Sequence, residues 1–518
     1  MSLLNHALRQ PKKTNHGTPK LCFLALIFPL LFSSFTNAAP FSIEQTHVIL
    51  PELEKQIEAG MKRTRVPGIA VGIIINNKVV YSKGFGERKI GENAPITADT
   101  VFQVASVSKP LTSTVIAALV GENVLQWNSK INQLDPQFLL KDPWVSSEVT
   151  IEDLLSHRSG LPDHAGDILE DLGFDQKTIL HQLRLEPITE FRKNYKYTNF
   201  GFTEAALAAA KIAGVSWDTL VHQKMLNPLG MASTSTNFDT FINNPNHADL
   251  HVMEEGIPKA LFQRNPDAQT PAGGFSMSMN DFCKWMLLQI SEGKFNGKQL
   301  IPADTLKQTH LPYITRGPNS FYGLGWNISY NTKDEAILSH AGMFSLGAIT
   351  TVKIIPSKGF GIAVFANAAV TGLPEAIIDI FMDLQRTGQI EKDWVPIWEE
   401  RVQALFGHEK KSFNPIKIRS EPLPNNAYVG SYANEYYGEA NVTEKNGKLY
   451  LTVRPMEESF PLNPLNRDVF SFESNKETIN GMSPVLFTID ETGIANQFLL
   501  EAFNANGLGI FKKHKPGS

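Results

Sequence analysis

A hydroxyl and an amine stand three residues apart at Ser106 and Lys109, at the start of a helix expected over 106–121. Side chains at i and i+3 share one helix face about 5–6 Å apart, so the amine can take the hydroxyl proton. The lysine must then be neutral part of the time, which burial and nearby positive charge achieve by lowering its pKa. The helix N-terminus favours negative charge developing near the serine. The pair indicates nucleophilic catalysis by serine.

The spacing by itself is a weak signal, because the same pair recurs at Ser291 and Lys294. There Gly293 and the following Asn296-Gly297 indicate a turn after a helix instead of a helix start. We therefore expect no catalytic role for Ser291 and Lys294.

Two further motifs strengthen the first. Tyr197-Thr198-Asn199 lies just before a helix expected over 201–213, and offers a phenol that relays protons and an amide that holds a substrate carbonyl. His340-Ala341-Gly342 directly precedes a glycine-rich, strand-like run, where a missing side chain lets substrate approach the backbone. Tyr432-Ala433-Asn434 and His164-Ala165-Gly166 repeat these letters by chance. Order and local context therefore carry the signal.

The elements that must position these residues alternate irregularly between strand and helix. Apolar runs at 69–75 and 78–85 flank Asn76-Asn77, a dipeptide suited to a tight hairpin. Strand-like runs return at 347–355 and 359–366, so strands from both ends of this region can share one sheet. Helical patterns cover 50–64, 150–156, 176–184, 280–292 and 374–386. The fold class is α+β, an antiparallel sheet flanked by helices plus a helical subdomain.

The last part of the chain has a different character. Residues 387–425 contain several prolines and are typical of a linker. From 426 to 518 short alternating segments dominate, with hairpin turns at Asn446-Gly447 and around Glu491-Thr492-Gly493. We expect a small all-β, barrel-like domain after a main domain over 39–386.

The N-terminus has the pattern of an export signal. Residues 1–20 are basic with no acid, 21–35 are almost wholly apolar, and small residues lead to Ala38. The apolar run is shorter than a spanning helix needs, and Cys22 is misplaced for a lipid anchor. We expect a signal peptide over 1–38, cleavage near Ala38 and a periplasmic or secreted protein. Cys283 would then be the single cysteine, expected to be a buried apolar residue.

Composition excludes some classes of function. The chain has 48 Lys+Arg against 52 Asp+Glu, a net charge of -4, so the basic surplus of a nucleic-acid binder is missing. His157, His164 and Asp163 match no standard metal-ligand spacing, and we expect them to form structural hydrogen bonds. Neither a metal nor a cofactor is predicted, and no integral membrane association.

At this point the sequence resembles the serine β-lactamase and penicillin-binding-protein superfamily, most closely its class C-type branch, which includes D-peptidases and esterases. The resemblance covers roughly 45–386. Besides the three motifs it rests on four segments, 154–162, 228–231, 271–274 and 322–326, the last containing Tyr322 and Trp326. The tail from about 426 resembles the lipocalin-like module appended to some serine hydrolases of this branch.

The resemblance implies roles for individual residues. Ser106 would be the nucleophile, Lys109 and Tyr197 a coupled proton shuttle, and Asn199 a partner of Lys109 and of the substrate carbonyl. The backbone N–H groups of Ser106 and Met343 would form an oxyanion hole beside Gly342. Which of Lys109 and Tyr197 is the acylation base stays open.

One residue departs from the β-lactamase pattern. Those enzymes commonly begin the third motif with lysine, a permanent cation for the antibiotic's carboxylate, whereas His340 is neutral for much of its time near pH 7. The leading hypothesis is therefore an exported serine hydrolase of small peptides, amides or esters, cell-wall fragments among them. The alternatives are a class C-like β-lactamase and a non-catalytic protein that binds penicillin or cell-wall fragments.

Overall fold

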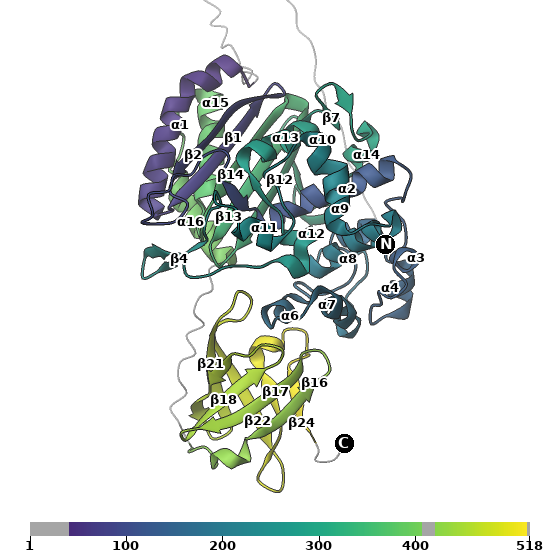
Figure 1. Ribbon diagram of the computed structural model, residues 1–518, viewed down its shortest axis with the longest axis vertical. Coiled ribbons are helices and arrows are strands. Elements are labelled where there is room, and N and C mark those ends of the chain that lie inside the picture. The colour runs from purple at the N-terminus through teal and green to yellow at the C-terminus, as the bar shows by residue number, and fades with distance from the viewer. Residues whose placement is uncertain (1–40, 407–419, 515–518) are drawn as a thin grey trace, which may run out of the picture. The chain divides into compact units, whose positions relative to one another are not determined.

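An antiparallel sheet of eight strands forms the centre of the N-terminal domain (Figure 1). It is seen in a computed structural model that describes residues 41–406 and 420–514. In spatial order the strands are β2 (Lys78–Gly86), β1 (Gly68–Ile75), β14 (Phe360–Ala366), β13 (Ala348–Ile355), β12 (Ala336–Phe344), β11 (Asn327–Tyr330), β10 (Ser320–Tyr322) and β9 (Ile314–Gly317).

Strands from both ends of this domain share one sheet, as the sequence predicted. β1 pairs with β2 through the Asn76-Asn77 turn, where φ is 50° and 58°. Both values lie in the left-handed region that a two-residue hairpin turn requires and that asparagine tolerates. β1 also pairs with β14, Ile69 lying opposite Ala366. The predicted hairpin and the predicted shared sheet are confirmed.

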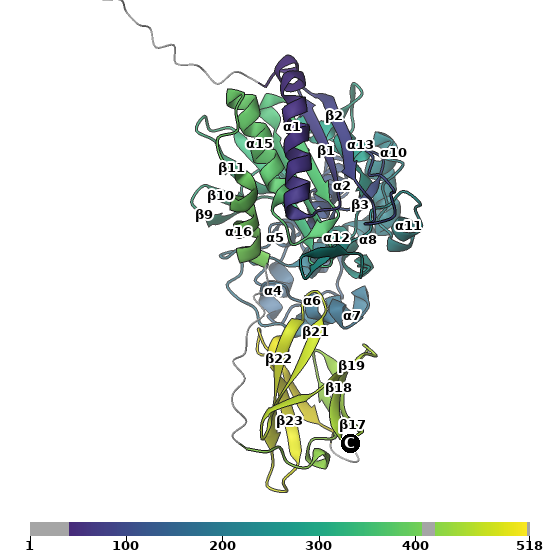
Figure 2. The same ribbon diagram turned by 90° about the vertical axis from the view of Figure 1, so that its left-hand side faces the viewer.

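Helices cover both faces of this sheet (Figure 2). Odd-numbered residues of β1, from Ile69 to Ile75, pack in one core cluster with α1 (Ile43–Thr64) and α15 (Leu373–Thr387). Even-numbered residues face α13 (Met279–Ile290), so close that a Cβ at Gly72 would lie 2.7 Å from Cys283 Sγ. Period-two alternation thus gives β1 two apolar faces. Cys283 is buried, as expected.

A helical region lies beside the sheet. Its longer members are α2 (Ser108–Gly121) and α8 (Asn199–Ala213), both apolar on most sides and largely buried. The shorter helices are α3 (Ile131–Leu134), α4 (Pro143–Glu148), α5 (Ile151–Leu155), α6 (Asp167–Asp171), α7 (Gln176–Gln182), α9 (Trp217–Val221), α10 (Asn227–Leu229), α11 (Phe238–Ile242), α12 (Thr270–Gly273) and α14 (Ala303–Gln308). Short strands complete the domain: β3 (Val101–Gln103), β4 (His251–Glu254), β5 (Ile257–Lys259), β6 (Ser276–Ser278), β7 (Lys294–Phe295), β8 (Lys298–Gln299) and β15 (Ala368–Ala369).

A second sheet of nine strands curves into a nearly closed barrel at the C-terminus (Figure 1). In spatial order its strands are β19 (Ser459–Pro461), β18 (Lys448–Val453), β17 (Gly438–Lys445), β16 (Gly430–Asn434), β24 (Ile510–Lys513), β23 (Ala495–Leu500), β22 (Asn480–Ile489), β21 (Val469–Asn475) and β20 (Asn463–Asn466). Aromatic rings fill it, Tyr432 lying 4.7 Å from Phe498 between ring centroids. The predicted all-β, barrel-like domain is confirmed.

Some expectations fall on residues outside the described ranges. The expected signal peptide over 1–38 lies there, and so does the middle of the expected linker. The linker's first part contains α16 (Trp394–Phe406). Within the described ranges, no helix combines the length and the apolar character that crossing a bilayer requires.

Candidate active site

Ser106 lies on a tight turn between a strand and a helix. The chain leaves β3, forms the 3-10 turn η1 (Ala105–Val107) and enters α2 directly. Ala105 has a φ of 46°, so the turn holds an alanine in a conformation that favours glycine. Its neighbours are buried, whereas Ser106 itself is partly exposed. The sequence placed the serine at the start of the helix. The structure places it in the 3-10 turn just before α2, where Ser106 is partly exposed while most of α2 is buried.

Lys109 lies in the first turn of α2 and is completely buried. Its Nζ donates to Ser106 Oγ at 3.2 Å, to Asn199 Oδ1 at 2.7 Å and to Ala272 O of α12 at 3.0 Å. Three acceptors satisfy the three protons of a charged amine. In the neutral form two N–H groups remain for Asn199 and Ala272, and the lone pair faces Ser106. The predicted serine–lysine contact is therefore present.

The surroundings of Lys109 favour its neutral form. Burial lowers its pKa to about 7, against an opposing effect of the Asp167 charge, which raises it. The Nζ also lies 4.5 Å from the centroid of the Tyr197 ring and 5.7 Å from that of Phe202. Because taking a charge out of water costs free energy, the amine gives up its proton near neutral pH.

Tyr197 brings a phenol to the same hydroxyl. Its OH donates to Ser106 Oγ at 2.7 Å. The backbone before α8 is fixed on both sides of it, because Tyr197 N donates to Asp163 Oδ1 and Tyr197 O accepts from His164 N, each at 2.7 Å. Burial raises the pKa of the phenol, against an opposing effect of the Ser106 hydrogen bond. Tyr197 is therefore a neutral donor at pH 7.

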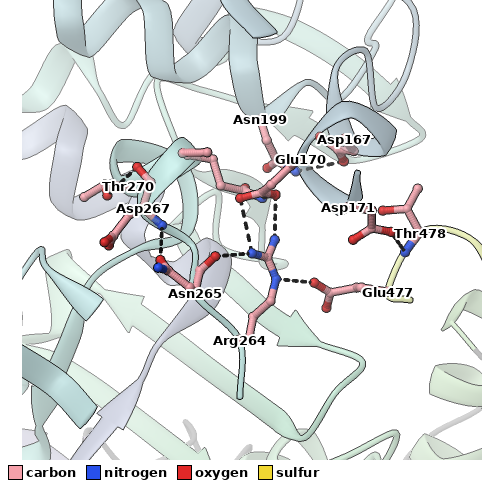
Figure 3. Close-up of polar contacts among 12 residues, drawn as sticks. Asp167, Glu170, Asp171, Asn199, Arg264, Asn265, Asp267, Thr270, Glu477 and Thr478 are labelled. Atoms are coloured by element: carbon pink, nitrogen blue, oxygen red, sulfur yellow. Dashed lines mark hydrogen bonds and ion pairs between the residues drawn. The ribbon is translucent and has the colours of Figure 1, made fainter. Parts of the chain in front are cut away.

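Asn199 connects the lysine to a carboxylate that the sequence did not single out. Its Oδ1 accepts from Lys109. Its Nδ2 donates to Asp167 Oδ2 at 3.0 Å, as Figure 3 shows. His164 Nδ1 lies 2.8 Å from the same Oδ2. These contacts fix the amide so that its oxygen, and not its nitrogen, faces the lysine.

His340 does not directly precede a strand, as the sequence suggested. It lies inside β12, between β11 and β13, and is buried. Its Nδ1 donates to Ala341 O at 2.8 Å, which leaves Nε2 to accept from Tyr322 OH at 3.0 Å. Burial, then the charge of Lys109, lowers the His340 pKa to about 3. The ring is a neutral structural partner of Tyr322, and only the backbone of this motif approaches the serine.

Gly342 brings β12 against the turn that carries Ser106. A Cβ here would lie 2.4 Å from Val104 O and 2.7 Å from Ser106 N, so only glycine permits the approach. Thr350 Oγ1 of β13 donates to Val104 O at 2.8 Å and holds the same junction. Met343, the next residue of β12, is partly exposed. The backbones of Ser106 and Met343 thus lie on adjoining segments.

A family model described as "Beta-lactamase" matches residues 53–385, well over half of the chain. The chain belongs to the beta-lactamase family. A second model, for a domain of unknown function named DUF3471, matches residues 414–508. The family assignment supports the superfamily resemblance, and the matched range contains Ser106, Lys109 and Tyr197.

Relatives and a solved structure agree with this assignment. The chain is 25% identical to "Unguisins hydrolase ungD'" of Aspergillus campestris, over 84% of this chain and 86% of that one. It is 23% identical to "Protein flp" of Staphylococcus aureus, over 63% and 64% respectively. The octameric penicillin-binding protein homologue from Pyrococcus abyssi has the same fold, with a TM-score of 0.59 and 22% identity over 90% of this chain and all of that one.

Other polar residues that the sequence raised have structural partners. His157 Nδ1 accepts from Thr198 N at 3.2 Å, and its ring lies 4.5 Å from that of Tyr197. Trp326 is buried and stacks on Trp285 at 5.6 Å. Across 41–406 and 420–514, no three His, Cys, Asp or Glu side chains gather as metal ligands.

Sequence reasoning missed two groups that contact the cluster and one charge that lies farther out. Asp167 and the Ala272 carbonyl orient Asn199 and Lys109, and Arg316 of β9 lies 4.8 Å from the Tyr195 ring. The charge of Arg316 contributes, after burial and Lys109, to lowering the His340 pKa. Pro271–Gly274 was a resemblance segment, and this was the one signal that pointed to Ala272. Nothing in the sequence pattern around Asp167 or Arg316 distinguishes these residues from the other charged residues of the chain.

Proposed function

We propose that this beta-lactamase family member is an exported serine hydrolase that cleaves small peptide, amide or ester substrates through an acyl-enzyme on Ser106. The observation that carries the proposal is that Ser106 Oγ contacts both Lys109 Nζ, at 3.2 Å, and Tyr197 OH, at 2.7 Å. The family match and a relative named as a hydrolase support it. The export assignment rests on the N-terminal sequence alone.

The chemistry follows from the two pKa directions. Neutral Lys109 accepts the Ser106 proton while Oγ bonds to the substrate carbonyl carbon, and the carbonyl oxygen becomes an oxyanion. The N–H groups of Ser106 and Met343 stabilise that oxyanion. Tyr197, protonated because burial raises its pKa, relays a proton to the leaving amine or alcohol. Water then attacks the acyl-enzyme, releases the acid and restores the hydroxyl.

A peptidase or esterase is favoured over an efficient β-lactamase because the third motif supplies no permanent cation. His340 is buried, and its pKa is lowered to about 3. A neutral imidazole engaged with Tyr322 offers no charge to an antibiotic's carboxylate.

We relate the C-terminal barrel to the lipocalin-like modules of class C-type hydrolases.

The test of the acyl-enzyme is covalent labelling of the folded protein. A fluorophosphonate probe and a penicillin are each incubated with the full chain, and the modified peptide is located by mass spectrometry. We expect the fluorophosphonate adduct on Ser106. Unmodified Ser106 with both probes, in protein that remains folded, contradicts the proposal.

The substrate class is tested with a panel of p-nitrophenyl esters, D- and L-aminoacyl amides and nitrocefin. Turnover of esters or amides well above that of nitrocefin supports the favoured assignment. Turnover of nitrocefin above all others identifies a β-lactamase instead. A stable penicillin adduct with no turnover of any substrate identifies a non-catalytic binding protein.

The activity should rise with pH through about 7, because the buried Lys109 has a pKa of about 7. Below that pH the amine is protonated and cannot accept the serine proton; above it the amine is neutral. We expect kcat/KM for a p-nitrophenyl ester to increase about tenfold per pH unit on the acid side and to level off above it. An acid limb that is absent between about pH 5 and 8 contradicts this assignment.

His164 needs a control, because its hydrogen bond to Asp167 raises its pKa from the usual value of 6.5. His164 contacts the same Asp167 carboxylate as Asn199, so its protonation changes the charge beside the Lys109 network. His164→Gln should retain the acid limb of the pH profile. Loss of the limb in that variant assigns it to His164 instead.

A further inference from the structure

The C-terminal barrel reaches the strand that carries Met343. The hairpin between β21 and β22 has Glu477 at its tip, and the main domain and barrel residues belong to one compact unit of the chain. Glu477 Oε1 accepts from the backbone N–H of Ser345 at 2.8 Å. Ser345 begins the turn that joins β12 to β13, two residues after Met343. A carboxylate from the barrel thus holds the end of β12.

The other oxygen of Glu477 engages Arg264 (Figure 3). Arg264 Nε lies 2.5 Å from Glu477 Oε2, and Nη2 lies 2.6 Å from Glu170 Oε2. The guanidinium is buried and sits 5.0 Å from the centroid of the Phe344 ring. Both carboxylates are therefore paired with one cation, which matters because an unpaired buried charge is costly.

Arg264 also contacts the strand that leads to the serine. Its carbonyl accepts from Gln103 Nε2 at 2.8 Å, and Gln103 is the last residue of β3. Arg264 therefore touches β3 through its backbone and Phe344 of β12 through its side chain. These two segments flank Ser106 and Met343. Glu477 contacts these segments through the Ser345 N–H and through the Arg264 side chain.

A second contact fixes the hairpin tip on α6. Asp171 Oδ2 accepts from Thr478 N at 2.5 Å and from Ile479 N at 3.3 Å (Figure 3). Asp171 ends the helix that Asp167 begins, and Asp167 holds Asn199. The hairpin tip is therefore held both by the turn after β12 and by α6, the helix whose Asp167 contacts Asn199.

We propose that Glu477 is a positioning residue for the Ser106 site: it fixes the β12–β13 turn so that the Met343 N–H stays aligned with that of Ser106. This inference rests on the proposed acyl-enzyme function. An oxyanion donor acts only when it is held within a fraction of an ångström of its place, and a partly exposed turn does not hold itself that firmly. The barrel domain thereby contributes to turnover without touching substrate.

The test compares Glu477→Ala with Glu477→Gln in the full chain. For Glu477→Ala we expect kcat to fall at least about tenfold with KM changed less than about twofold, because the lost alignment matters in the transition state. Glutamine retains an oxygen for the Ser345 N–H but presents an amide N–H to Arg264. The kcat of Glu477→Gln should therefore lie between those of wild type and Glu477→Ala. Fluorophosphonate titration of active sites corrects for misfolded protein.

Gln182→Ala is the matched control. Gln182 of α7 donates to Glu435 O at 2.8 Å and Tyr436 O at 3.0 Å, so it joins the same two domains away from β12. We expect its kcat to stay within about twofold of wild type. Equal kcat losses in Glu477→Ala and Gln182→Ala would show that Glu477 serves domain attachment only, and would overturn the proposal.

Amide hydrogen exchange separates this inference from the proposed function. Deuterium uptake over residues 336–355 should rise in Glu477→Ala and stay unchanged in Gln182→Ala. Unchanged uptake in both variants overturns the inference. If wild type shows no Ser106-dependent turnover, the proposed function fails, while the uptake still decides whether Glu477 orders the turn.

Discussion

Ser106→Ala is expected to lower kcat/KM by at least about 10⁴-fold on every substrate that the wild type turns over. The hydroxyl is the partly exposed group on which Lys109 Nζ and Tyr197 OH converge, at 3.2 and 2.7 Å. Removing it leaves a proton acceptor and a proton donor with no nucleophile between them. The measurement is steady-state kinetics on the substrate panel, combined with the absence of a fluorophosphonate adduct.

The chain supplies its own control for this variant. Ser291 has a lysine three residues later, like Ser106, but it caps the end of α13, and Lys294 is an exposed residue of β7. Ser291→Ala should leave kcat/KM within about twofold of wild type. A Ser106→Ala protein as active as wild type would remove the basis of the acyl-enzyme mechanism.

Lys109→Met is expected to lower kcat/KM by about 10³–10⁴-fold. Methionine keeps most of the length and the apolar stem of lysine but cannot accept a proton. It also leaves Asn199 Oδ1 and Ala272 O, which accept at 2.7 and 3.0 Å in the wild type, without their donor. Steady-state kinetics on purified protein, with circular dichroism to confirm folding, measures the loss.

The pH profile makes this second prediction specific. Any residual activity of Lys109→Met should lack the acid limb near pH 7, because the group responsible for it is gone. Lys294→Met, the matched replacement in the Ser291–Lys294 pair, should retain both the activity and the acid limb of the pH profile. A Lys109→Met enzyme with the wild-type limb would assign the proton acceptor to another group, Tyr197 foremost.

Much of the main domain's secondary structure depends on local sequence and could be predicted from it. The Asn76-Asn77 turn between two apolar runs fixes a hairpin, and β1 and β14 share one sheet as their patterns suggested, although the sequence did not predict that they are direct neighbours. The helix after Ser106 and the helix after Tyr197 also follow from spacing. The sequence did not predict β12, because its pattern placed His340-Ala341-Gly342 before a strand, whereas these residues lie within one and the histidine is buried.

The sequence by itself determined which residue types are available for the chemistry and the short elements that carry them, because hydrophobic periodicity and turn propensity act over a few residues. The tertiary structure alone decided that Asp167 orients Asn199, that burial brings the Lys109 pKa to about 7, and that Glu477 reaches Ser345 across 132 positions. Such contacts depend on how distant segments pack, and burial depends on all of them together. No local pattern encodes either one.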